Sequence, residues 1–509
     1  MEHLEGETAA EHAELSAGGG GSEDCLSALP DDVLLHILCV PGRTTTAART
    51  SVLSRRWRRL WTLLPDLFFV LDDANRDSLR GALAALEAMS DDEAPTLRKL
   101  TFLVFSSHAS LDSLAAWLPI AARRLTGLLD VIIVGDAGED GRGAFELPCF
   151  ERATEMKLRL GFLSLTLPPS GVFARLTDLS LEKLHLHGPC GIGEAVSSPR
   201  CPSLQRLNVV NAEGLGNFAI HSESLLKIRL EKSCGLQQLT IVAPALKKLT
   251  VLYCFAHDSD PSQPVADIAA PQLVSLHWRD AYHPSSVQFG EMAQLELLGA
   301  TFFLVDEEDG YEHNRDCVRL LRHFQDVSTL TLELAYMPED IEEDLGEHHY
   351  LMEDMARLPY VTFLTLLITA KGHSFGASSF HVLMTCTSIR KLMLIFSSSP
   401  DLEAEPACAS GCLCDHPPNW KTEELVLNRL QEVEISYLKG TEHDFALVKR
   451  LFSWATALTT MTISFHLLIT ESMAKEFCQR ILGFSKPDIC LKFYVYHDFY
   501  KKVLYVPED

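Results

Sequence analysis

The chain has 509 residues and a formal net charge of −25, because 44 lysines and arginines stand against 69 aspartates and glutamates. This length allows two or more cores or one long repeat array, and it excludes a small disulfide-dependent scaffold. The acidic balance repels phosphate, so we expect no nucleic-acid partner. No stretch approaches the roughly eighteen apolar residues of a membrane-spanning helix, so we expect no membrane partner.

The N-terminus and the cysteines indicate the compartment. Residues 1–23 are rich in glutamate, alanine and glycine, and we expect them to form a disordered acidic tail without a secretory leader. The fourteen cysteines are scattered along the chain, which is typical of reduced thiols. We therefore expect a cytoplasmic or nuclear protein, or one found in both places.

The first predicted helix covers residues 30–40. Pro30 suits its first turn, and the two aspartates that follow suit the positive end of the helix dipole. At about 100° per residue, Leu34 and Leu38 lie roughly a right angle away from the face formed by Val33 and Ile37. This helix is apolar on nearly all sides and needs packing partners around it.

The second predicted helix contains the sequence SVLSRRWRRLW, residues 51–61. Its arginines Arg55, Arg58 and Arg59 lie opposite a single apolar stripe, so the tryptophans and arginines are separated in space. The stripe consists of Leu53, Trp57, Leu60, Trp61 and Leu64. A segment of about 40 residues is near the limit of independent folding, so its surplus apolar surface needs a partner protein or the rest of its own chain.

Residues 24–64 resemble the F-box of plant F-box proteins. The resemblance is carried by Leu29-Pro30, LLHIL at 34–38, Thr50-Ser51 and VLSRRWRRLW at 52–61. It implies a three-helix module that binds the Skp-type linker protein, and through it a cullin, in an SCF-type ubiquitin ligase. The linker-binding residues that it implies, some of which must instead form the core of the module, are Leu29, Pro30, Leu34, Ile37, Leu38, Leu53, Trp57, Leu60 and Trp61.

A second region, residues 95–417, repeats the template L-x-x-L-x-L with apolar substitutes. In the copy LTDLSL, Leu179 and Leu181 alternate along a short strand and point into a shared core, while Leu176 packs the preceding turn. One such unit cannot bury its apolar face alone, so neighbouring units stack into a solenoid with a parallel sheet on its concave side. Copies begin at residues 97, 176, 204, 225, 246, 273, 327, 361 and 389, and two more at 430 and 458.

The region resembles leucine-rich repeats but departs from them in two ways. The spacing is loose, and the asparagine that often follows the strand is replaced by Leu184, Ala212, Ser233, Cys254 and Ala281. We therefore expect an irregular solenoid.

Two acidic segments, Asp306–Asp316 and Pro338–Met355, interrupt the repeats. They are interpreted as solvated loops or helix faces, with an acidic rim that selects basic partners as the alternative.

Metal and catalytic chemistry find little support. Cys408, Cys412, Cys414 and His416 are close together, but their spacing is not that of a standard zinc finger. His185 and His187 alone are more typical of surface residues. The chain has no phosphate-cradling glycine loop and no hydrolase motif. We expect no metal, no cofactor and no catalytic site.

Residues 418–500 resemble the FBD region found beside F-box and repeat regions in plants. The pattern predicts strands at 430–437, 458–465 and 489–496, with helices at 443–457 and 472–482 between them. This unit is suited to cap the solenoid.

The predicted fold is therefore α/β: a three-helix F-box, an irregular leucine-rich-repeat solenoid with a parallel sheet, and an α/β cap. The predicted function is a non-catalytic adaptor that captures an unidentified substrate protein for ubiquitin transfer. The alternative is a repeat scaffold or signal receptor that binds a partner or small molecule without promoting degradation.

Overall fold

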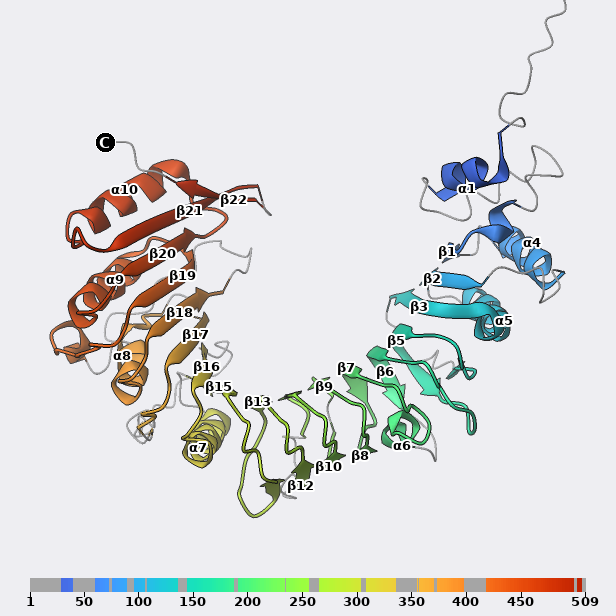
Figure 1. Cartoon of the computed structure of the whole chain (residues 1–509), viewed down its shortest axis with the longest axis horizontal. Helices are drawn as coiled ribbons and strands as arrows, with labels where there is room; N and C mark the ends of the chain where they lie inside the picture. The colour runs from blue at the N-terminus through green and yellow to red at the C-terminus, as the bar shows by residue number, and fades with distance from the viewer. Residues whose placement is uncertain are drawn as a thin grey trace, which may run out of the picture.

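A computed structural model describes most of the chain. The described residues are 29–39, 60–72, 76–88, 96–105, 108–135, 144–186, 191–233, 235–255, 265–303, 308–335, 355, 357–369, 373–397, 418–498 and 501–505. They form an open arc in which a mostly parallel sheet lines the inner side and a second layer covers the outer side (Figure 1). The arc is a mixed α/β solenoid, in agreement with the repeat pattern.

The inner sheet follows the chain from one end of the arc to the other. Each strand pairs in parallel with the next, so the spatial order equals the sequence order. The strands are β1 (Asp66–Leu71), β2 (Leu97–Phe105), β3 (Leu125–Val134), β5 (Glu155–Thr166), β6 (Asp178–Leu186), β7 (Arg206–Glu213), β9 (Lys227–Glu231), β11 (Lys248–Leu252), β13 (Ser275–Arg279), β15 (Leu297–Phe303), β16 (Thr329–Ala335), β17 (Phe363–Thr369), β18 (Lys391–Phe396), β19 (Glu432–Leu438), β20 (Thr460–Phe465) and β21 (Cys490–Asp498).

Two short strands lie at the margins of this sheet. The strand β4 (Ala144–Glu146) pairs with the second half of β5, and β22 (Lys501–Tyr505) pairs antiparallel with β21. At the other end of the chain are the helix α1 (Asp31–Cys39) and the 3-10 turn η2 (Trp61–Leu63).

The outer layer changes character along the arc. Helices cover the two arms, whereas a second parallel sheet covers the middle (Figure 1). The helices are α4 (Arg76–Glu87), α5 (His108–Arg124), α6 (Ile192–Val196), α7 (Glu308–His323), α8 (Gly376–Thr385), α9 (Glu442–Trp454) and α10 (Glu471–Leu482), with a 3-10 turn η6 (Pro418–Lys421). The outer strands are β8 (Asn217–His221), β10 (Gln238–Val242), β12 (Val265–Ala269) and β14 (Val287–Phe289).

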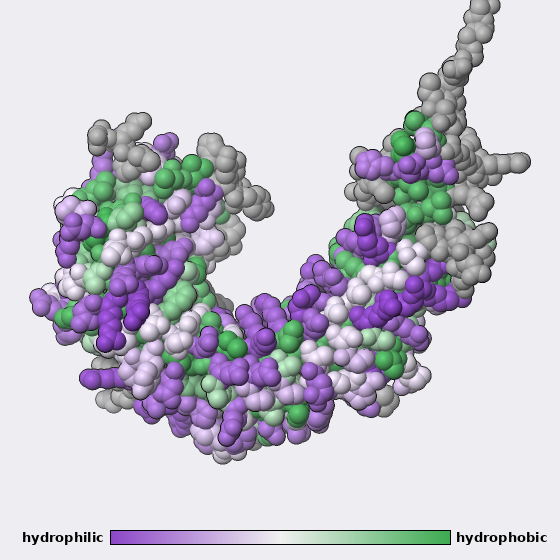
Figure 2. Space-filling model, viewed as in Figure 1, coloured by the Kyte–Doolittle hydropathy of each residue, from purple (hydrophilic) through white to green (hydrophobic). Residues whose placement is uncertain are grey.

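The repeat template explains the core. In β6 the three template leucines, Leu176, Leu179 and Leu181, are all buried, as the sequence predicts. Every other copy of the template also places its last two apolar residues on an inner strand, where alternation directs them toward the outer layer. The visible inner surface in the middle of the arc is mainly hydrophilic (Figure 2). One continuous apolar layer therefore runs between the two faces.

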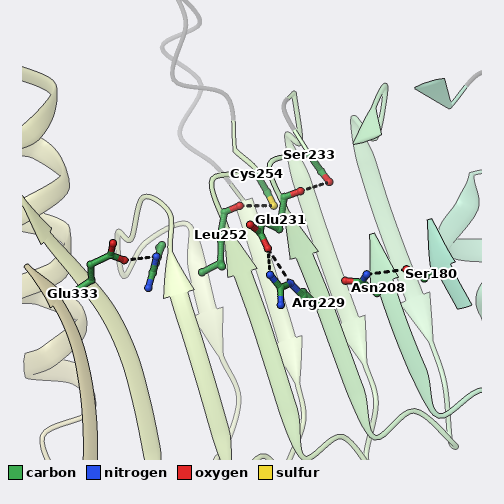
Figure 3. A network of polar contacts seen from close by, with 9 residues as sticks. Ser180, Asn208, Arg229, Glu231, Ser233, Leu252, Cys254 and Glu333 are labelled. Carbon is green, nitrogen blue, oxygen red and sulfur yellow. Dashed lines mark hydrogen bonds and ion pairs between the residues drawn. The ribbon is translucent and has the colours of Figure 1, made fainter. Parts of the chain in front are cut away.

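A residue in the left-handed backbone conformation precedes the position at which leucine-rich repeats often have an asparagine. Lys183, Asn211, Lys232 and Tyr253 have φ between 48° and 55°, and each stands directly before one of the substituted positions. The turn sends the following side chain inward, so Leu184, Ala212, Ser233 and Cys254 are fully buried. The two polar side chains of this set donate hydrogen bonds to backbone carbonyls of the strand that precedes them. The Ser233 hydroxyl donates to the Glu231 carbonyl at 3.2 Å, and the Cys254 thiol donates to the Leu252 carbonyl at 3.3 Å (Figure 3).

The N-terminal and C-terminal regions agree with the prediction to different extents. α1 confirms the first helix, but most of the second lies outside the described residues, as do residues 1–23, so the three-helix arrangement stays a prediction. The sheet starts at Asp66, earlier than residue 95, because β1 is a buried strand in register with β2. The predicted strands and helices of residues 418–500 are confirmed as β19, α9, β20, α10 and β21, and they continue the same sheet.

The left-handed position after β9 can be tested by Lys232→Gly. Glycine adopts a positive φ without the penalty that a Cβ incurs, so this variant should be as stable as the parent chain or more stable by up to about 1 kcal/mol in urea unfolding. The control Lys157→Gly, in the regular part of β5, should lose about 0.5–1 kcal/mol. Equal losses at both positions would contradict the left-handed turn.

Candidate functional site

The predicted docking residues divide by burial. Leu34 and Leu38 on α1, and Leu60 and Trp61 at η2, are 5% exposed or less and join the core of the chain. Leu29 is partly buried against the same core. Pro30 is exposed, and Val33 beside it, which was not in the predicted set, is 40% exposed.

The structure thus brings four predicted residues together in the interior, where α1 packs against η2. Leu53, Trp57 and the Ile37 side chain lie outside the described part of the chain.

The inner face of the sheet is the largest surface that the repeats build. Its side chains occupy alternate strand positions, and strand pairing aligns them in lateral rows across the arc. On the N-terminal arm the rows mix apolar and charged side chains: Phe105 and Val134 are register partners and both are more than 40% exposed, whereas Asp130 is the register partner of Lys157. Toward the middle the same rows turn polar and basic.

Four cations gather in the middle of the inner face. Arg206, Lys227 and Lys248 are register partners on β7, β9 and β11, and Arg229 stands two residues after Lys227 on the same face. We call these four residues the basic cluster. Burial and the charges of Lys227 and Arg229 lower the pKa of the Lys248 ammonium. A positive potential is thereby concentrated on a chain whose net charge is negative.

The members of the basic cluster differ in their partners. Arg206 forms an ion pair with Asp178, and Arg229 forms one with Glu231, with its Nε 2.9 Å from the carboxylate (Figure 3). Among the described residues, neither Lys227 nor Lys248 has an ion-pair partner. Two ammonium groups are therefore left available to a ligand.

His277 extends the basic cluster onto β13. It is half-buried, and burial together with Lys248, Arg279 and Arg229 lowers the pKa of its imidazole to about 4, so the ring is neutral at physiological pH. Its Nε2 is buried without a hydrogen-bond partner in the described structure. The ring occupies space left by Gly299 on β15, where a Cβ would lie 2.6 Å from Nδ1.

The neighbouring polar groups are already engaged with one another. Asn208 donates through Nδ2 to the Ser180 hydroxyl at 2.9 Å, and Arg279 forms an ion pair with Glu333 across two strands (Figure 3). The Lys227 and Lys248 ammonium groups lie between these two pairs.

Aspartate carboxylates, one buried and one partly buried, connect successive repeats behind this face. Asp280 is 3% exposed, and its Oδ1 accepts from the backbone N–H groups of Cys254 at 2.8 Å and Phe255 at 3.0 Å. Burial raises its pKa to about 7 despite these hydrogen bonds. One repeat later, Asp316 accepts from the Tyr282 N–H at 3.0 Å.

These cross-repeat contacts were missed by the sequence reasoning. Asp316 was interpreted as the end of a solvated acidic segment, but α7 begins at Glu308 and carries it to the repeat above. An aspartate directly after a repeat strand, as at Asp280, is the signal that could have indicated such a contact. The segment Pro338–Met355 lies outside the described residues except for Met355.

Four of the described cysteines are poor nucleophiles. Burial raises the pKa of Cys201, Cys317 and Cys478 to about 12 and that of Cys386 to about 11. A thiol at such a pKa carries almost no thiolate at neutral pH. Transfer of ubiquitin through any of these four sulfurs is therefore unfavourable.

Metal-binding groups and membrane-spanning helices are absent from the described residues. These residues contain no group of three His, Cys, Asp or Glu side chains placed to hold a metal ion, and no helix long and apolar enough to span a membrane. His185 contacts Glu213 at 3.0 Å, while His187 and the segment with Cys408, Cys412, Cys414 and His416 lie outside the described residues.

Comparison with known proteins finds relatives in plants. No established family profile matches the chain. A putative F-box/FBD/LRR-repeat protein of Arabidopsis thaliana is 26% identical over 91% of this chain and 93% of its own length. Another F-box/FBD/LRR-repeat protein from the same plant is 32% identical over 45% of this chain and 53% of its own.

A third relative supports the same conclusion. A putative F-box/LRR-repeat protein of Arabidopsis thaliana is 23% identical over 86% of this chain and 91% of its own. The chain is thus an α/β repeat protein that is similar to plant F-box proteins. These similarities are to F-box/FBD/LRR-repeat and F-box/LRR-repeat proteins of Arabidopsis thaliana.

The buried Asp280 makes stability depend on pH. Because its folded pKa of about 7 lies above the usual value of 3.8, its contribution is present below about pH 4 and is lost as pH rises through about 7. Asp280→Asn removes this titration, so the variant should gain on the order of 4 kcal/mol relative to the parent between pH 4 and pH 8. Urea unfolding at both pH values measures the change, and a pH-independent difference would contradict it.

Proposed function

We propose that this protein is a substrate-recognition adaptor of an SCF-type ubiquitin ligase. In this role the F-box docks to a Skp-type linker protein, and through it to a cullin, while the repeats capture a target protein. The supporting observation is the similarity to a named F-box/FBD/LRR-repeat protein along almost the whole of both chains. The names of the relatives place the same three kinds of region in one protein.

The geometry is compatible with this division of labour. α1 and η2 lie at one end of the arc, beyond β1, and leave the inner face open (Figure 1). A target held on that face would be kept near a conjugating enzyme delivered by the cullin. Such an adaptor raises the effective concentration of the target and needs no catalytic group of its own.

The docking surface follows from the burial on α1. Leu34, Leu38, Leu60 and Trp61 would shape the module from inside, because they are already buried in the chain. Pro30 and Val33 are exposed and available to the linker. We propose that the first turn of α1 contributes direct linker contacts, together with those residues of the predicted set, Ile37, Leu53 and Trp57, whose side chains are not described.

The alternative function is a repeat scaffold or signal receptor that does not promote degradation. A small molecule would need an enclosed pocket, and such pockets measure about 300–1,000 Å³. The cavity lined by Phe173, Leu181 and Ile192 measures about 20 Å³ and is apolar. This comparison favours capture of a protein on the open inner face over a buried small-molecule signal in that cavity.

The remaining parts of the proposal are simple. The chain acts as a non-catalytic subunit without metal or cofactor, in the cytoplasm, the nucleus or both. Neither nucleic acid nor membrane is among its proposed partners.

Linker binding tests the adaptor role. The purified full chain should capture a recombinant plant Skp-type linker, and Val33→Asp should weaken that capture at least tenfold, because it buries a charge in an apolar contact. The control Val426→Asp changes a valine that is 63% exposed near the other end of the chain and should bind the linker normally. Failure of the parent chain to bind the linker would refute the proposed function.

A further inference from the structure

The basic cluster is the feature that the proposed function does not yet explain. We propose that Lys227 and Lys248, with Arg229 and His277 beside them, form an anion-binding site for acidic or phosphorylated residues in the captured target protein. This inference rests on the proposed function, because it identifies which part of the inner face recognises the target and by what chemistry.

First, the placement of Lys227 opposite Lys248 costs the free protein electrostatic energy. Paired strands lie about 4.8 Å apart, so the register partners Lys227 and Lys248 hold like charges on adjacent strands. Like charges directly opposite each other destabilise a sheet. A carboxylate or phosphate bound between the two ammonium groups removes that repulsion. The cluster is therefore better suited to a bound state than to the free one.

The second argument is the asymmetry of partners around the cluster. Arg206 is paired with Asp178 on one side of the two lysines, and on the other side Arg279, which lies in a different row, is paired with Glu333. Between them stand the two lysines without ion-pair partners among the described residues. A lysine offers three rotatable donors. An anion at this point would meet donors from β9 and β11.

The third argument concerns the shape and surroundings of the site. The inner face is open, which suits an extended peptide lying across the strands. Beyond β15 and β16 the same rows include half-buried apolar side chains, interspersed with Lys391: Phe363 and Leu367 on β17 and Met393 and Ile395 on β18. A peptide can therefore place acidic residues over the basic cluster and apolar residues over β17 and β18.

The strand spacing sets the length of such a peptide. Four inter-strand steps separate β11 from β17, which is roughly 15–20 Å along the inner face. An extended chain covers this distance in about five or six residues. The geometry thus points to a target segment with its negative charge and its apolar residue about six positions apart.

Direct peptide binding tests the site. Three fluorescein-labelled peptides share one sequence, with a leucine six residues from a variable triplet of glutamates, glutamines or phosphoserines. In fluorescence anisotropy with the purified full chain, both anionic peptides should bind at least tenfold more tightly than the glutamine peptide. Tighter binding of the phosphoserine peptide would assign the site to phosphorylated targets, and equal binding would assign it to acidic ones.

Charge-matched variants separate this site from general attraction. Lys227→Gln/Lys248→Gln should weaken both anionic peptides at least tenfold. Lys99→Gln/Lys492→Gln removes the same two charges from the far ends of the same face and should change affinity less than twofold. Equal losses in the two variants, or anionic peptides that bind no better than the glutamine peptide, would overturn the proposal.

Two controls keep the result interpretable. Lys227→Gln/Lys248→Gln should unfold at the same temperature as the parent chain or higher, because it relieves repulsion. Lys248→Arg keeps the charge and should retain peptide binding within a few fold. If the peptides bind but the linker does not, the adaptor role fails and the anion site stands; if the linker binds and the peptides do not, only the anion site is refuted.

Discussion

Parallel pairing between successive repeats is the interaction on which this structure depends. A single strand such as β6 has two inward leucines that no local element can cover, so its apolar side is buried only when β5 and β7 lie alongside and the outer layer closes over all three. Register is therefore fixed by burial, and a slip of one residue would turn every inward leucine to solvent. The lateral rows of the inner face, including the basic cluster, are a consequence of that register.

The sequence predicts this part of the fold well because the same demand recurs in every repeat. All the templates lie on inner strands, and the strands and helices of the C-terminal region agree with their expected order. Strands β1 and β15 were not predicted, although LPDLFF at 64 and LELLGA at 295 place apolar residues at the template spacing and bury them in the same way. Burial of Leu34 and Leu38 could not be deduced, since it depends on η2 and β1 packing beside α1.

The polar features show why a site is harder to predict than a fold. Lys227 and Lys248 are separated by a whole repeat in sequence, and only strand register makes them neighbours. In the sequence Asp280 directly follows a repeat strand, as a loop residue does, yet its carboxylate accepts hydrogen bonds from backbone groups 25 and 26 residues away. Such contacts depend on how one repeat sits on the next. A template that describes each repeat alone does not contain that information.

The antiparallel strand β22 has a consequence for how the protein behaves in a crowded cell. A parallel solenoid ends in a row of unpaired backbone groups, and such an edge invites pairing with another chain. Here β22 turns back along β21 and begins with Lys501 and Lys502, so the edge ends in a reversed strand that carries positive charge. Because β22 covers the free edge of β21, a further parallel strand cannot pair with β21. One short hairpin therefore ends the parallel order of the sheet, and its two lysines disfavour pairing with another chain.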